Sequence, residues 1–244
     1  MMAEPPDAGF SAWGDPFADI LHGHLLPAAA AEDEERVARI AAEALASFQA
    51  LARVRRAVSV FGSARPEPVD RWGDLARRTS VALTRAGFAV MTGGGPGLMA
   101  AANEGAMGAG GTSVGLTIHL PAQEEPNGHL SVHVPFNYFF LRKLAFVKYA
   151  CAFICLPGGY GTLDELFEAL NLKRTHKMHP FPVVLMGASY WTGLREWMAG
   201  TCIPSGTLDA RDLGALEITD DPEVVVAQVE ACHARLCREL GIHG

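Results

Sequence analysis

The chain has 244 residues, of which 49% are hydrophobic, so it is long and apolar enough to fold around a large core. Its formal net charge is −7 at pH 7 and it contains no long basic run, which argues against general binding to nucleic acid or to a membrane surface. No run of about 18 apolar residues is present, which argues against a membrane-spanning helix.

The N-terminal segment, residues 1–31, is rich in Pro, Gly and Ala and is predicted to form a flexible or loosely docked arm. Its first ten residues lack the basic start and apolar stretch of a secretory signal, so we expect a cytoplasmic protein. His22 and His24 are interpreted as loop residues rather than a metal site. Residues 32–54 carry apolar side chains at helical spacing, which predicts a helix that covers a sheet face or forms a subunit contact.

From residue 57 onward, predicted strands alternate with predicted helices. The strands are expected at 57–61, 88–91, 112–118, 130–134, 151–156, 181–186 and 216–219. The helices are expected at 69–85, 97–109, 136–148, 162–175, around 190–197 and at 222–240. This alternation predicts a Rossmann-like α/β fold, a doubly wound and mainly parallel sheet with helices on both faces. Residues 32–244 are therefore expected to form a single domain.

The five cysteines are odd in number and include no CxxC pair. Cys151 and Cys155 lie in one apolar strand, and Cys232 and Cys237 lie in the last helix. This pattern predicts free, buried thiols in a reducing compartment rather than disulfides.

The most informative stretch runs from Leu156 to Glu165, with the sequence LPGGYGTLDE. It joins a buried strand to an amphipathic helix through a turn with three glycines. Such a turn lets a ligand approach the backbone, and the following helix N-terminus favours a phosphate. Pro157, Gly158, Gly159, Tyr160, Gly161 and Thr162 are therefore predicted to hold a phosphate, while Glu165 is predicted to face the attached ribose.

Glu165 also has a purely structural interpretation. Thr162 and Glu165 fit the S/T-x-x-E capping box, in which the glutamate only satisfies a backbone N–H at the helix start. A capping residue contributes roughly 1 kcal/mol to stability. Loss of a catalytic carboxylate instead lowers the rate by orders of magnitude with little effect on folding.

Two other strand ends are expected to join the same site. The first predicted strand ends in Gly62-Ser63-Ala64-Arg65, where Arg65 either meets a phosphate or lies in a solvated loop. The second leads into a glycine-rich turn, Thr92 to Met99, whose predicted binding residues are Thr92, Gly93, Gly94, Gly95, Gly97 and Met99. This turn matches neither the G-x-G-x-x-G fingerprint nor a P-loop, which disfavours binding of NAD and hydrolysis of ATP.

Three charged residues complete the candidate set. Arg142 and Lys143 follow an aromatic segment and precede the strand that leads to Gly158, so two cations are expected near the carboxylate and the phosphate. Glu104 follows the second glycine turn and is a candidate ligand contact. The alternative for each residue is a solvated charge on a helix.

The order and spacing of these motifs resemble the LONELY GUY (LOG) family, long labelled as lysine decarboxylases. The resemblance rests on residues 157–165, which match PGGxGTxxE, on the turn at residues 92–99, and on Arg142-Lys143 between them. It covers about residues 56–235 and is closest to the longer, bacterial branch.

The resemblance implies a cytokinin riboside 5′-monophosphate phosphoribohydrolase, often also active on AMP, with Glu165 and Arg142 as catalytic residues. It further implies a homodimer or larger homo-oligomer, no metal and no cofactor. The decarboxylase label lacks support, since we find no pyridoxal-binding lysine constellation. A carrier of phosphate-bearing ligands, similar to molybdenum cofactor carrier proteins, is the alternative function. AMP and cytokinin nucleotides both stay open as substrates, and Glu165 could activate water, bind ribose or stabilise positive charge.

Overall fold

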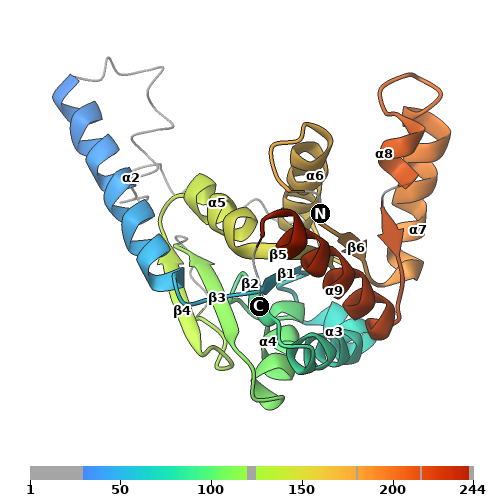
Figure 1. The fold of residues 1–244 in the computed structure, drawn as a ribbon, viewed down its shortest axis with the longest axis horizontal. Coiled ribbons are helices and arrows are strands. Elements are labelled where there is room, and N and C mark those ends of the chain that lie inside the picture. Colours follow the sequence, from blue (N-terminus) through green and yellow to red (C-terminus); the bar gives the residue numbers. More distant parts are fainter. Residues whose placement is uncertain (1–29, 120–124, 180, 215, 242–244) are drawn as a thin grey trace, which may run out of the picture.

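The computed structural model of the chain describes residues 30–119, 125–179, 181–214 and 216–241, so residues 1–29 of the predicted N-terminal arm, with His22 and His24, lie outside them. Residues 30 and 31, also predicted as part of the arm, belong to the first helix of the described residues instead. Seven strands form one parallel sheet in the order β4-β3-β2-β1-β5-β6-β7 (Figure 1). The strands are β1 (Ala57–Phe61), β2 (Ala89–Thr92), β3 (Ser113–Ile118), β4 (Val132–Phe136), β5 (Ala150–Cys155), β6 (Val183–Leu185) and β7 (Glu217–Ile218). The predicted doubly wound parallel α/β fold is thus confirmed.

The helices cover both faces of this sheet. They are α2 (Ala30–Leu51), α3 (Glu67–Arg85), α4 (Leu98–Gly108), α5 (Phe139–Tyr149), α6 (Tyr160–Arg174), α7 (Ala188–Trp197), the π-helix η2 (Met198–Cys202), α8 (Ala210–Gly214) and α9 (Pro222–Glu239). Helices α3 and α4 lie together on one face, and α5 and α6 lie on the other (Figure 1). None of the helices among these residues is both long and apolar enough to cross a membrane.

Alternating side chains of the central strands fill two cores. Ala57 and Phe61 of β1 enter the core beneath α5 and α6, whereas Val58 and Val60 enter the core above α3, α4 and α9. A strand that is buried on both faces is typically apolar at nearly every position, and β1, with the sequence AVSVF, is apolar except for one buried serine.

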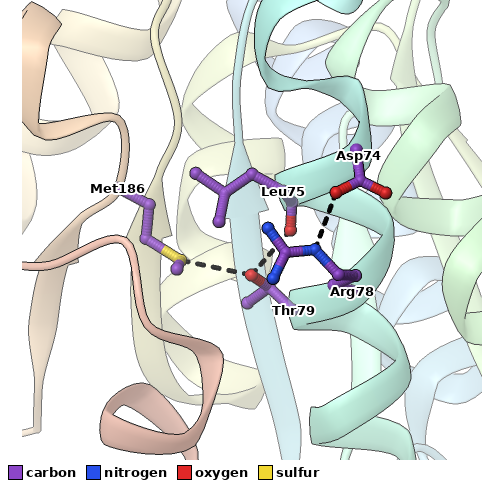
Figure 2. Close-up of polar contacts among 5 residues, drawn as sticks. All are labelled: Asp74, Leu75, Arg78, Thr79 and Met186. Carbon is purple, nitrogen blue, oxygen red and sulfur yellow. Dashed lines mark hydrogen bonds and ion pairs between the residues drawn. The ribbon is translucent and has the colours of Figure 1, made fainter.

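Helix α3 shows how a covering helix divides its residues between core and solvent. The buried Thr79 donates a hydrogen bond to the Leu75 carbonyl oxygen at 2.8 Å, and its hydroxyl lies 3.4 Å from the Met186 sulfur (Figure 2). On the outer side, Arg78 pairs with Asp74 one turn earlier, with 2.7 Å between nitrogen and oxygen. Apolar and small residues therefore face the sheet while ion pairs face water, as helical periodicity predicts.

The predicted boundaries agree with the structure to within a few residues, with one instructive error around Pro135. We predicted that a strand ended at residue 134 and a helix began at 136, but β4 continues to Phe136 and α5 begins at Phe139. Proline is tolerated here because β4 is an edge strand, where a missing N–H removes no hydrogen bond of the sheet interior. Helix α8 and the π-helix η2 were not predicted.

The cysteine prediction is confirmed in its main point, since all five thiols are free. Cys155 and Cys232 are buried, whereas Cys151, Cys202 and Cys237 are half-buried. Burial raises the pKa of Cys151 to about 12, which leaves this thiol protonated and unreactive at neutral pH.

Candidate active site

A pocket of about 900 Å³ lies at the carboxyl ends of β1, β2 and β5. The chain adds β2, β3 and β4 on one side of β1 and then crosses to add β5, β6 and β7 on the other. Loops diverge at such a switch point, which leaves the crevice where open α/β sheets bind ligands. The pocket therefore lies where the strand-end motifs predicted a site.

Ser63 ties the three strand-end loops together. Its backbone N–H donates to the Pro157 carbonyl oxygen at 3.0 Å, and its own carbonyl oxygen accepts from the Leu98 N–H at 2.9 Å. Its hydroxyl accepts from the Arg65 N–H at 3.1 Å. The loop after β1 thus sets the spacing between the glycine turns after β2 and β5.

The N-terminus of α6 faces this pocket. The first hydrogen bond of the helix runs from the Leu163 N–H to the Gly159 carbonyl oxygen at 3.0 Å, so the amides of residues 160–162 precede it. A Cβ added at Gly159 or Gly161 would meet no atom within 4 Å. Packing of the fold therefore does not require glycine at these two positions. A ligand that approaches the backbone closely would require it, because any side chain there would block the approach. Unpaired amides at a helix start suit a phosphate.

Gly97 plays a different part in the second glycine turn. Its φ is +70°, and an added Cβ would lie 2.3 Å from the Ser63 carbonyl oxygen. No side chain fits there, so Gly97 holds the turn against the β1 loop rather than lining the pocket.

A buried polar network supports the same turn from behind. The Thr92 hydroxyl donates to Asn103 Oδ1 at 2.6 Å and accepts from the Gly94 N–H at 2.9 Å. Asn127, in the segment before β4, donates from Nδ2 to the Gly95 carbonyl oxygen at 2.9 Å and to Asn103 Oδ1 at 3.0 Å. These bonds fix Gly94 and Gly95, which line the pocket.

Glu165 lies in the first turns of α6, with only 8% of its surface exposed. Its Oε2 atom is buried and has no hydrogen-bond partner among the described residues. Burial raises the pKa of Glu165 to about 7, with Lys143 and Arg142 opposing the effect and the Glu168 and Asp164 carboxylates adding to it.

The capping-box interpretation of Glu165 is wrong. Gly159 is the residue that precedes α6, and the helix start has no side-chain cap. Thr162 is already inside the helix and packs its hydroxyl against Gly158, where an added Cβ would lie 2.1 Å from the Thr162 oxygen. Since neither residue satisfies the helix N-terminus, the buried carboxyl of Glu165 has no structural role of that kind.

Arg142 reaches into the pocket from α5. Its Nε donates to the Leu116 carbonyl oxygen at 2.8 Å, and its guanidinium lies 5.3 Å from the centre of the Phe146 ring. A Cβ added at Gly93 would lie 2.4 Å from Arg142 Nη2, so glycine at this position makes room for the guanidinium. Burial lowers the pKa of Arg142 and the charge of Glu165 opposes that change, which places both groups in one electrostatic environment.

Lys143 lies beside the pocket and is not one of its lining residues. Its ammonium lies 2.9 Å from both carboxylate oxygens of Asp164 and 3.3 Å from Glu168 Oε2. The prediction that Lys143 contacts the ligand is therefore not supported by its position. It neutralises the acids that flank Glu165 and so links α5 to α6.

The structure brings most of the predicted site residues to the wall of one pocket. These are Gly62, Ser63, Arg65, Gly93, Gly94, Gly95, Met99, Arg142, Pro157, Gly158, Gly159, Tyr160, Gly161, Thr162 and Glu165. Thr92, Gly97, Glu104 and Lys143 lie outside it. Glu104 is exposed and pairs with Arg77 of α3 at 2.5 Å, so it holds α4 against α3. Contact between any of these residues and a ligand stays a prediction.

Sequence analysis missed the aromatic wall of the pocket. Tyr190 of α7 donates from its hydroxyl to the Gly158 carbonyl oxygen at 2.7 Å, and its ring meets Trp72 of α3 edge to face at 6.0 Å. Tyr190 follows the carboxyl end of β6, which is a usable signal for a site residue. Trp72 offered none, because an aromatic residue at helical spacing resembles a core residue.

The residues available limit what the pocket can hold. No lysine is found among its lining residues in the described part of the chain. The same residues contain no group of three or more His, Cys, Asp or Glu side chains placed to bind a metal ion. The charged groups on the pocket wall are two carboxyls, Asp164 and Glu165, and two guanidinium groups, Arg65 and Arg142, and the two glycine turns lie beside them.

Comparison with known proteins gives consistent similarities. Residues 99–229 match the family model described as "Possible lysine decarboxylase". A cytokinin riboside 5′-monophosphate phosphoribohydrolase of Rhodococcoides fascians is 32% identical over 135 residues, which cover 54% of this chain and 67% of that protein. A protein of the same name from Mycobacterium tuberculosis is 29% identical over 167 residues, covering 67% and 88%.

Solved structures share the fold. An X-ray structure of a structural genomics target has a TM-score of 0.58 at 27% identity and covers 72% of this chain and 99% of its own. The molybdenum cofactor carrier protein of Chlamydomonas reinhardtii has a TM-score of 0.56 at 20% identity, with coverage of 74% and 99%. At that identity the second likeness concerns the fold alone.

Proposed function

Because the chain belongs to the family described as "Possible lysine decarboxylase", known also as the LONELY GUY (LOG) family, we propose that it is a nucleoside 5′-monophosphate phosphoribohydrolase. The reaction is hydrolysis of the N-glycosidic bond of a cytokinin riboside 5′-monophosphate or of AMP. Water adds its oxygen to C1′ of the ribose, and the adenine-type base leaves with the proton. The products are the free base and ribose 5-phosphate.

One observation carries this proposal: the buried carboxyl of Glu165 and the guanidinium of Arg142 line the same pocket as the N-terminus of α6. A binding site for a phosphate alone would need the amides and a cation, but not a carboxyl of raised pKa. Buried groups of this kind are costly to fold and cluster where chemistry is performed.

In this proposal each part of the pocket has its own role. The amides at the start of α6, together with the Gly93–Gly95 turn and Arg65, hold the 5′-phosphate and so orient the ribose. Cleavage passes through an oxocarbenium-like state in which C1′ becomes positive. The Glu165 carboxylate stabilises this charge or takes the proton of the attacking water, and Arg142 orients Glu165 or assists the departing base.

The lysine decarboxylase description in the family name does not fit this pocket. Pyridoxal-dependent decarboxylation needs a lysine that forms a Schiff base with the cofactor. Lys143 does not line the pocket, and its ammonium is paired with Asp164 and Glu168. A nucleosidase needs no such lysine.

Product analysis tests the proposal. AMP and isopentenyladenosine 5′-monophosphate are incubated with wild type, Glu165→Gln and Arg142→Ala, and release of free base is followed by chromatography. We expect base release by wild type and a loss of 100-fold or more in both variants, on the order seen for catalytic groups. Glu104→Gln, a carboxylate outside the pocket, is the matched control and should keep full activity.

The alternative function is that of a carrier, favoured by the shared fold of the molybdenum cofactor carrier protein. A carrier would bind nucleotide or another phosphate-bearing ligand tightly without releasing base. No base release from either nucleotide, with binding retained by calorimetry, would refute the nucleosidase and favour the carrier. A faster reaction with the isopentenyl substrate would indicate cytokinin activation.

A homodimer or larger homo-oligomer belongs to this proposal, together with a cytoplasmic location. Phe140 and Leu144 of α5 and Phe167 of α6 are exposed apolar side chains on the two helices that carry Arg142 and Glu165, which supports burial by a second copy. Light scattering after size exclusion measures the assembly directly, and a monomeric protein would refute this part.

A further inference from the structure

Helix α2 precedes the sheet and contributes one carboxylate to the start of α5. Glu43 Oε1 accepts hydrogen bonds from the backbone N–H groups of Asn137 at 3.0 Å and Tyr138 at 3.2 Å. Its Oε2 accepts from the Asn137 side-chain amide at 2.8 Å. These contacts join residues 94 and 95 positions apart in the chain.

This carboxylate accepts a hydrogen bond at the N-cap position of α5. Tyr138 precedes α5, and the helix has no cap from its own side chains and no acidic residue in its first turn. Backbone amides at a helix start need acceptors, and a negative charge there interacts favourably with the helix dipole. Glu43 therefore satisfies the N–H of Tyr138, the residue that precedes α5, and the N–H of Asn137 before it, and places a negative charge near the helix start.

The same contact leads to the active site by a short path. The Tyr138 carbonyl oxygen accepts the N–H of Arg142 at 3.1 Å, one turn into α5. Arg142 then donates through Nε to the Leu116 carbonyl oxygen at 2.8 Å. Glu43 thus accepts from the N–H of Tyr138, and the carbonyl oxygen of the same residue accepts from Arg142. Tyr138 therefore connects Glu43 to the residue that carries the guanidinium.

We propose that Glu43 is a positioning residue for the hydrolysis: by capping α5 from α2 it sets the position of the Arg142 guanidinium relative to Glu165. This inference rests on the proposed function through the role of Arg142. It also makes α2 a part of the active-site support, although α2 contributes no residue to the pocket wall.

Hydrogen exchange tests the structural step without reference to activity. Glu43→Ala should speed deuterium uptake in peptides that span residues 137–143, by tenfold or more, and leave peptides of α6 unchanged. The matched controls are Glu34→Ala, an exposed acid on the same helix, and Ile40→Ala, which removes apolar packing of α2 but spares the carboxylate. Unchanged uptake in Glu43→Ala would overturn the inference.

Kinetics test the functional step. A displacement of a catalytic group by about 1 Å lowers rates up to about 100-fold, so we expect Glu43→Ala to lower kcat by tenfold to 100-fold. KM should change less than about twofold, because no residue of α2 lines the pocket. Glu43→Gln keeps an acceptor oxygen and should recover part of the rate, whereas Ile40→Ala at a temperature below its unfolding should keep full kcat.

A double-mutant cycle separates positioning from general destabilisation. In an Arg142→Lys background, Glu43→Ala should lower kcat less than about twofold, since the group that it positions has been replaced. An equal loss in both backgrounds would overturn the inference, and so would unchanged kcat in Glu43→Ala. If wild type releases no base at all, the proposed function fails, while the exchange result still decides whether Glu43 holds α5.

Discussion

Replacing Glu165 by glutamine tests the electrostatics of the site through protein stability. The native pKa of Glu165 is about 7, compared with 4.5 for an exposed glutamate, because the carboxyl is buried. Below pH 4.5 the carboxyl is protonated in both the folded and the unfolded chain. Between 4.5 and 7 only the folded chain keeps the proton, so stability falls as the pH rises. The difference between the two pKa values corresponds to roughly 3 kcal/mol.

The measurement is urea unfolding of wild type and Glu165→Gln at a series of pH values from 5 to 9 and at one protein concentration. Glutamine carries no charge at any of them. The free energy of unfolding of the variant, relative to that of wild type, should therefore rise by about 2.5 kcal/mol from pH 5 to pH 9, with most of the rise below pH 7. Other titrating groups contribute equally to both proteins and cancel in the comparison.

If the free energies of unfolding of the two proteins changed with pH in parallel, this reasoning would be refuted. Glu165 would then ionise in the folded protein as it does in water. A gap that grows in the opposite direction would mean that Lys143 and Arg142 stabilise the carboxylate more than burial destabilises it. Glu104→Gln removes an exposed carboxylate at 46% side-chain exposure and should change the curve little.

Two further substitutions test the surroundings of the same carboxyl. Gly93→Ala should lower kcat/KM at least tenfold, because the new Cβ would lie 2.4 Å from Arg142 Nη2. Gly108→Ala is the control, since a Cβ there meets no atom within 4 Å. Equal activity of the two variants would contradict this reasoning. Lys143→Met removes the largest opposing charge, so the pKa of Glu165 should rise further and the midpoint of the kcat rise with pH should move up by about one pH unit. A pH–rate profile with an unmoved midpoint would show that Lys143 does not influence the reacting carboxyl.

Local patterns in the chain were enough to predict the fold and to propose a candidate site at the strand ends. Helical and strand periodicity, together with glycine turns at strand ends, indicated the doubly wound sheet, and every prediction of this kind depends on residues close together in sequence. The turn at residues 157–162 and Glu165 were found in this way. Arg142 was a candidate from its position before the strand that leads to this turn, and the resemblance to a family implied its catalytic role; it lies on the wall of the same pocket as Glu165.

What the tertiary structure decided concerns partners that are far apart in the chain. Lys143 and Glu104 were expected at the ligand, but Lys143 bonds to Asp164 across 21 positions and Glu104 bonds to Arg77 across 27. Glu43 caps α5 across 94 positions. Such contacts depend on how helices are oriented on the sheet, and that orientation arises from packing of whole surfaces. No pattern within a short window of sequence encodes it, so charges that look alike in the chain acquire different roles once the helices are packed.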